Sequence, residues 1–274
     1  MLICCDGMLR SGSAFQYNLV CSLLEKMGSC KRHGRRESEE EWLSSPVQEW
    51  IEAKDIYHVV KSSTYIYTEK LQMARDGRTR IFYIHRDIRD VAVAAKSKWG
   101  LAGDELFVML DRAVNSYTTL EKDEAFGKPW LLHQKYEDVF NNTTEAVCEI
   151  ARFLNLSPSQ EIIEEVIKEC SIEVMYAHSK SKSLYFNHTM RNSLGNIANF
   201  IKRFLPPPLN ESWGLRKIYM GLFPKLEKHT AIAYNHIEPT RGVPEAWREQ
   251  LNKTEQELIT ARYKGYLMRA GYLT

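Results

Sequence analysis

The chain has 274 residues, a length that suits one or two domains. Hydrophobic residues make up 44% of it and charged residues 26%, which excludes a chain that is disordered, collagen-like or coiled-coil throughout. The 37 basic side chains nearly balance the 35 acidic ones, so the net charge of +2 gives no general argument for nucleic-acid binding.

Three features bear on the compartment. No apolar run reaches the roughly 18 residues of a transmembrane helix, so we expect no membrane span. The chain opens on a short apolar run without a charged segment before it, so we expect no signal peptide and a cytosolic location. The six cysteines form no Cys-x-x-Cys pair, which favours reduced and mostly buried thiols.

Short apolar runs alternate with helical patterns in the first half of the chain. Strands are predicted at residues 2–5, 56–60, 80–85 and 130–133, and helices at 13–26, 64–75, 88–99 and 104–126. Strands separated by helices are typical of β-α-β units. We therefore expect an α/β protein of three layers, like the P-loop nucleotide hydrolases, with a central parallel sheet covered on both faces.

Three later helices carry start signals. Asn142-Thr143-Thr144-Glu145 resembles a capping box, and Pro158 suits the first position of the next helix. The segment Thr254-Glu255-Gln256-Glu257 begins the last predicted helix, which extends to about Arg269.

Two segments interrupt this pattern. Residues 28–41 predict a polar loop, with a mobile lid as the alternative. Residues 178–235 lack strand signals, contain many aromatic residues and predict a helical cap inserted into a single domain of residues 1–274. The cap has nine basic and two acidic side chains, so its net charge is +7 and the rest of the chain carries −5. A basic cap would steer anions, and a solvated basic surface is the alternative.

An anion-binding loop is predicted after the first strand. A strand, a tight glycine turn and a helix N-terminus together present N–H groups and a favourable helix dipole to an anion. Gly7 and Gly12 have the spacing of a Walker A loop, but Ser13 and Ala14 stand where that loop needs Lys and Ser/Thr. This disfavours a P-loop nucleotide hydrolase, and Arg10 places a cation inside the loop instead.

The same loop, Arg10-Ser11-Gly12-Ser13-Ala14-Phe15, resembles a motif of the sulfotransferases that use 3′-phosphoadenosine 5′-phosphosulfate (PAPS). Their 5′-phosphosulfate loop reads Lys/Arg-Ser-Gly-Thr/Ser-x-Trp, and Phe15 stands at the Trp position. Further segments resemble family motifs in the expected order: Arg86-Asp87-Ile88-Arg89-Asp90-Val91, Tyr136-Glu137-Asp138-Val139, residues 170–175 and Thr240-Arg241-Gly242. The resemblance covers roughly residues 1–175 and 236–274, and saxitoxin-type bacterial sulfotransferases are similar in size.

The resemblance implies roles for the matching residues. Arg10 and the amides of residues 10–14 would hold the 5′-phosphosulfate, and Lys61 would follow the sulfuryl oxygens. Arg86 and Arg241 would hold the 3′-phosphate, with close backbone approach at Gly242. The adenine site would be lined by Phe15, Tyr136 and Ile172. No metal is required.

Arg86 also stands out without the resemblance. It closes a predicted strand, so its guanidinium is expected at the carboxyl edge of the sheet, where open α/β folds bind ligands. A guanidinium can donate to two phosphate oxygens at once. The alternative is a structural arginine paired with Asp87 or Asp90.

Some positions depart from the family pattern. Ala94 replaces a serine that contacts the 3′-phosphate, and Ser97 is a candidate substitute. Many members have Lys-x-His after the second strand, where the His takes the proton of the acceptor. Here Lys61 keeps the cation, but Ser63 stands at the His position, and serine is a poor general base.

The histidines do not repair this departure. His58 lies at an odd offset from Lys61 and so faces the other side of its strand. His85 flanks Arg86 and is also expected to point away from it. His178 and His188, in the predicted cap, stay open as alternatives.

The leading hypothesis is a PAPS-dependent sulfotransferase that moves a sulfuryl group in line to a hydroxyl or nitrogen of a small molecule. We expect no nucleic-acid or membrane partner, and leave a homodimer open. The alternatives are a non-catalytic nucleotide-binding module of the same fold, motivated by Ser63 and Ala94, and an atypical P-loop kinase for small molecules.

Overall fold

The computed structural model of the chain describes residues 1–28, 30–35, 42, 45–53, 55–62, 68–171, 173–174 and 242–273. The predicted cap at residues 178–235 lies outside these ranges, so its helical character stays a prediction. In the described part of the chain, no helix has the length and apolar character needed to cross a bilayer.

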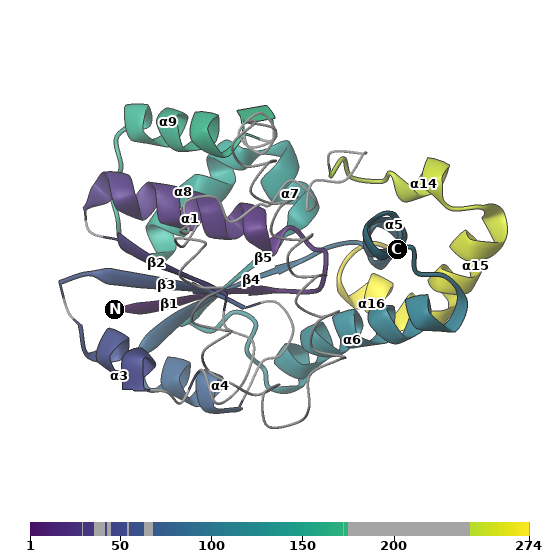
Figure 1. The fold of residues 1–274 in the computed structure, drawn as a ribbon, viewed down its shortest axis with the longest axis horizontal. Coiled ribbons are helices and arrows are strands. Elements are labelled where there is room, and N and C mark those ends of the chain that lie inside the picture. Colours follow the sequence, from purple (N-terminus) through teal and green to yellow (C-terminus); the bar gives the residue numbers. More distant parts are fainter. Residues whose placement is uncertain are drawn as a thin grey trace, which may run out of the picture.

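Five strands form one parallel sheet in the order β2-β3-β1-β4-β5 (Figure 1). The strands are β1 Leu2–Gly7, β2 Cys30–Arg35, β3 Tyr57–Lys61, β4 Thr79–His85 and β5 Leu131–Lys135. The central strand β1 is buried along its whole length. Its sequence, Leu-Ile-Cys-Cys, is apolar on both faces because helices cover both faces of a parallel sheet. The expected α/β class is confirmed.

Helices form a layer on each face of the sheet (Figure 1). One layer consists of α1 Ser13–Met27, α7 Tyr136–Asn141, α8 Thr143–Phe153 and α9 Gln160–Cys170. The other contains α3 Ser45–Glu52, α4 Thr68–Arg75, α5 Ile88–Trp99 and α6 Gly103–Lys122. The C-terminal helices α14 Trp247–Gln250, α15 Lys253–Arg262 and α16 Lys264–Arg269 join this second layer beside α5 and α6.

Two apolar cores follow from this layering. Ile3 and Cys5 of β1 face the core under α1, and Leu2 and Cys4 face the core under α5 and α6. This alternation is the two-residue period of a strand. Four of the six cysteines are buried, in agreement with the expectation of mostly buried thiols.

The interpretation of residues 28–41 as a loop or lid is wrong for residues 30–35, which form the edge strand β2. The segment Cys-Lys-Arg-His-Gly-Arg lacks an apolar run, so its composition indicates a loop. An edge strand pairs on one side only and tolerates charged side chains. Arg32 illustrates this, because it forms an ion pair with Glu25 of α1 at 2.7 Å while its backbone pairs with β3.

Most helix boundaries match the prediction, and α5 matches it at both ends. The larger differences concern three of the predicted helices. The helix expected to start at Pro158 starts at Gln160, where Ser159 caps it by accepting a hydrogen bond from the Ile162 N–H. The helix expected to run to residue 126 ends at Lys122. The last predicted helix is interrupted at Tyr263 and forms α15 and α16, and its capping box begins at Asn252.

His85 of β4 and His133 of β5 lie side by side, the first buried and the second half-buried, with a 2.8 Å contact between His133 Nε2 and His85 Nδ1. Burial, together with the neighbouring His133, lowers the pKa of His85 to about 3, and burial lowers the pKa of His133 to about 4. Both rings therefore stay neutral in the folded state. His85 points into the core, as expected for a neighbour of Arg86.

This pair predicts an acid-sensitive fold. In the unfolded chain each histidine titrates near pH 6.5, so the unfolded state binds more protons as the pH falls below that value. We expect the free energy of unfolding to fall by roughly 0.8 kcal/mol per histidine between pH 7.5 and 6. Urea denaturation at both pH values measures this loss. His133→Phe should reduce the pH dependence by the share of one histidine, and an unchanged dependence would contradict the assignment.

Candidate active site

The loop between β1 and α1 has the geometry of an anion-binding turn. Arg10 and Gly12 both have positive φ angles, 62° and 86°, and α1 begins at Ser13. The buried Ser11 hydroxyl donates to the carbonyl oxygens of Met8 at 2.7 Å and Ile84 at 2.9 Å. The serine hydroxyl thus ties the loop to β4. The N-terminus of α1 carries the partial positive charge that favours an anion.

Tyr136 closes the space between this loop and the returning C-terminal segment. A Cβ atom at Gly12 would lie 2.4 Å from the Tyr136 ring, and one at Gly242 would lie 2.3 Å from its hydroxyl oxygen. That hydroxyl donates to the Gly242 carbonyl at 2.9 Å. Both positions need glycine, because φ is positive at each and the tyrosine fills the space of a side chain.

Arg86 lies at the end of β4 and connects these parts. Its side chain is almost wholly buried, and its guanidinium donates to the carbonyls of Arg10 at 3.4 Å and Gly242 at 3.2 Å. The guanidinium carbon lies 4.5 Å from the centre of the Tyr136 ring. The predicted residues Arg10, Gly12, Arg86, Tyr136 and Gly242 therefore meet at the carboxyl edge of the sheet.

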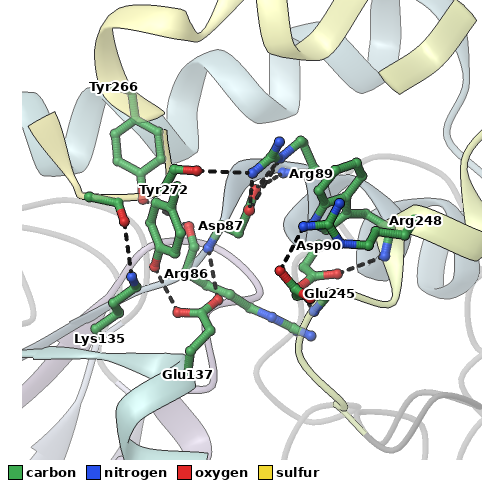
Figure 2. A network of polar contacts seen from close by, with 12 residues as sticks. Arg86, Asp87, Arg89, Asp90, Lys135, Glu137, Glu245, Arg248, Tyr266 and Tyr272 are labelled. Atoms are coloured by element: carbon green, nitrogen blue, oxygen red, sulfur yellow. Dashed lines mark hydrogen bonds and ion pairs between the residues drawn. The ribbon is translucent and has the colours of Figure 1, made fainter. Parts of the chain in front are cut away.

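Polar side chains close to Arg86 form a network of hydrogen bonds and ion pairs (Figure 2). Asp87 caps α5 and pairs with Arg89 at 2.6 Å, so its carboxylate is engaged within its own helix turn. The Glu137 carboxylate accepts from the Asp87 N–H at 3.1 Å and from the Tyr272 hydroxyl at 2.8 Å. The pKa of Glu137 is raised above its usual value, because burial has a larger effect than the opposing effects of these hydrogen bonds and Arg86.

The C-terminus supports the backbone of this edge directly. The Tyr266 hydroxyl donates to the Arg86 carbonyl at 2.8 Å, and Lys135 donates to the Gly271 carbonyl at 3.2 Å. Residues after 240 therefore complete the site, although they follow its first loop by more than 200 positions in the sequence.

Lys61 is placed as expected, at the end of β3 beside β1. Its backbone lies opposite Cys5, and its side chain is half-buried. The next residue, Ser62, donates its N–H to the Cys5 carbonyl at 2.9 Å. Ser63, the predicted position of the proton acceptor, lies outside the described residues. His58 stacks on His33. Its odd offset from Lys61 puts it on the other face of β3, where Val59 and Val60 also alternate between the two cores.

The remaining predicted residues fall into three groups. Ala94 is fully buried in α5 and has no polar side-chain atom, whereas Ser97 is exposed on the same helix, so its role as a substitute stays a prediction. Phe15 is buried in the core under α1. Ile172 and Arg241 lie outside the described residues, and their roles stay predictions.

Sequence reasoning missed a buried ion pair beneath the loop. Lys70 of α4 and Asp6 of β1 meet at 2.7 Å with side chains 0% and 3% exposed. The Lys70 ammonium also lies 3.5 Å from the Ser62 hydroxyl and 5.0 Å from the Trp42 ring centre. An aspartate at the end of an otherwise apolar strand is the only sequence signal for it.

Taken together, the parallel sheet and the loop at its carboxyl edge define an α/β protein with a candidate anion site. A family model for the sulfotransferase domain matches residues 3–204, well over half of the chain. The chain therefore belongs to the sulfotransferase family, as its motifs predicted. No curated protein matches the sequence.

Solved structures share the fold. Retinol dehydratase, crystallised with androsterone and the inactive cofactor PAP, has a TM-score of 0.54 and 14% identity, and the alignment covers 97% of this chain and 80% of that one. Mouse sulfotransferase SULT7A1 complexed with PAP has a TM-score of 0.56 and 10% identity, covering 97% and 83%. At these identities the likeness shows the fold alone.

Proposed function

We propose that the chain transfers a sulfuryl group from PAPS to a hydroxyl or nitrogen of a small-molecule acceptor, in line and without a metal. The observation that carries the proposal is the convergence of two arginines, a glycine turn and a helix N-terminus at one edge of the sheet. Arg10 follows β1 and Arg86 follows β4, and the Arg86 guanidinium donates to the Arg10 carbonyl, so arginines from two different strand ends lie at this edge. This placement suits a ligand with two separate anionic groups.

The residues present fit such a cofactor. The loop offers N–H groups and the cation of Arg10 to a 5′-phosphosulfate, and the fork of Arg86 suits a 3′-phosphate. Gly12 and Gly242 let the backbone approach closely on both sides of Tyr136. When bound, PAPS would supply a sulfuryl group already joined to a phosphate leaving group.

The chain's own residues would orient the reactants and stabilise charge. Arg10 would neutralise the negative charge that grows on the leaving phosphate, because a preorganised cation acts without reorganisation of solvent. Lys61, one strand away, would hold the sulfuryl oxygens during transfer. Arg86 would fix the other end of the nucleotide, which keeps the attacking and leaving oxygens in line.

The comparisons also support a small-molecule acceptor. One retinol dehydratase structure holds androsterone with PAP, and a second, with a TM-score of 0.51, holds retinol with PAP. Both are compact organic molecules rather than polymers. For this chain, the acceptor is proposed only as a small molecule with a free hydroxyl or amine.

Two assays test the function. Thermal shift in EDTA with PAP should raise the melting temperature, whereas ATP with Mg²⁺ should have a smaller effect. Incubation with labelled PAPS and a panel of phenols, alcohols and amines should then yield a sulfated product. PAP binding without transfer to any acceptor would favour the non-catalytic module, and a preference for Mg²⁺-ATP would favour the kinase.

Arg10→Ala should remove most turnover, with a fall in kcat of about tenfold or more, because charge-assisted contacts to the transferring group are worth about 1.5–3 kcal/mol. Arg78→Ala is the control, because this exposed arginine precedes β4 at the opposite edge of the sheet. Steady-state kinetics of both variants with PAPS provides the comparison. If Arg10→Ala kept its rate within about twofold of the wild type, the assignment would be wrong.

A further inference from the structure

The carboxylate of Asp90 joins α5 to a chain segment more than 150 positions away. One oxygen accepts the backbone N–H of Glu245 at 2.8 Å, and the other accepts that of Trp247 at 2.9 Å. Asp90 is 1% exposed, and its bond to Trp247 is buried whereas its bond to Glu245 is partly buried. A buried carboxylate holding two N–H groups fixes the backbone it contacts, because release would leave these polar groups without partners.

The residue before Asp90 strengthens the same attachment. The Arg89 guanidinium carbon lies 3.9 Å from the centre of the buried Trp247 ring. Arg89 is itself held by Asp87, and Figure 2 shows these side chains gathered at the start of α5. The first turn of α5 thus holds residues 245–247 in place. It bonds to their backbone N–H groups and contacts the ring of Trp247.

The segment of residues 242–247 begins at Gly242, which contacts the proposed cofactor-binding residues. Its carbonyl accepts from Arg86 at 3.2 Å and from Tyr136 at 2.9 Å. Only two residues, Val243 and Pro244, lie between Gly242 and Glu245, so the two positions are at most about 10 Å apart even in an extended chain. The position of Gly242 therefore depends on the Asp90 attachment, and Arg86 is oriented by the carbonyl that Gly242 presents.

We propose that Asp90 is a positioning residue that seats the segment 242–247 against Arg86 and thereby sets the preference of the site for a nucleotide with a 3′-phosphate. The inference rests on the proposed PAPS-dependent function. Asp90 touches neither cofactor nor acceptor. It acts through Gly242 and Arg86, so its loss should weaken 3′-phosphate recognition more than recognition of the rest of the nucleotide.

The experiment compares the affinities of two nucleotides. Isothermal titration gives the dissociation constants of PAP and of adenosine 5′-monophosphate, which lacks the 3′-phosphate. The dissociation constant of adenosine 5′-monophosphate divided by that of PAP measures the preference for the 3′-phosphate. Asp90→Ala should reduce this ratio at least about tenfold, and Asp90→Asn, which keeps one acceptor oxygen, should have a smaller effect.

Two further variants separate positioning from a general loss of structure. Gly242→Ala disturbs the same segment from the other side, because its Cβ would lie 2.3 Å from the Tyr136 hydroxyl, and it leaves Asp90 intact. It should also reduce the ratio, and it keeps the test valid if Asp90→Ala does not fold. Asp111→Ala is the control, because Asp111 also anchors the C-terminal part, through Arg262 and Tyr263, on the exposed side of α6. It should leave the ratio unchanged.

The outcomes for the two proposals are distinct. A wild-type protein with no preference for PAP would overturn the proposed function. A wild type that prefers PAP, with the same ratio in folded Asp90→Ala and Gly242→Ala, would overturn only the positioning role. A fall of the ratio in Asp111→Ala as large as in Asp90→Ala would also overturn it, since any loosening of the C-terminus would then suffice.

Discussion

Lys70→Met is expected to destabilise the fold by about 3–5 kcal/mol, because it leaves the Asp6 carboxylate charged and buried without its cation. The two side chains are 0% and 3% exposed and meet at 2.7 Å, so water cannot replace the lost partner without entering the core. Urea denaturation of both proteins at neutral pH measures the difference in free energy of unfolding.

A second substitution tests the cause. The double variant Asp6→Leu/Lys70→Met removes both charges and should recover most of the loss, because an apolar pair of similar volume avoids the desolvation of ions. Arg75→Met is the matched control on the same helix. Arg75 pairs with Asp123 at the surface, where such pairs contribute about 1 kcal/mol or less. A loss below about 1 kcal/mol in Lys70→Met would contradict this account of the pair.

Arg86→Ala is expected to weaken PAP binding by about 100-fold or more, because two charge-assisted hydrogen bonds, each worth about 1.5–3 kcal/mol, are lost together. The guanidinium already lies between the loop and Gly242, over the Tyr136 ring, so little reorganisation is needed when an anion binds. Arg86→Lys keeps the charge but cannot donate to two phosphate oxygens at once. Its affinity for PAP should therefore lie between those of the wild type and Arg86→Ala. Isothermal titration at fixed ionic strength measures the effect.

Arg80→Ala is the matched control for this prediction. Arg80 lies at the opposite end of β4 and donates to the carbonyls of Pro129 and Phe153, far along the strand from the loop. Its loss should leave PAP affinity unchanged. Arg86→Ala that binds PAP within about threefold of the wild type, while folded, would remove Arg86 from the cofactor site.

The parts of the molecule that were predictable are those encoded by local order. The apolar runs of β1, β3 and β4 are buried on both faces, so composition alone marks them. The loop of residues 10–15 joins a strand directly to a helix, and its function depends on its own backbone. Arg86 was identified for the same reason, because the end of a parallel strand has a known place in the fold.

The features that the sequence did not predict depend on contacts with distant parts of the chain. β2 has a polar sequence and is a strand because β3 offers it one edge to pair with. Lys70 looks like an ordinary surface residue of a short helix, and it is buried by tertiary contacts that include Asp6 of β1 and the ring of Trp42. Asp90 reads as an early helical acid, and only the return of the C-terminus gives it two N–H groups to accept.

The sequence by itself predicted the class of fold, the position of the candidate anion loop and the family, because short segments of the chain encode each of them. Only the tertiary structure decided that Tyr136 fills the space between Gly12 and Gly242, and that Arg86 donates across that space to both sides. These contacts join residues separated by 76 to 156 positions. Local propensity carries no record of such pairings, because they form only when the sheet brings distant strand ends to one edge.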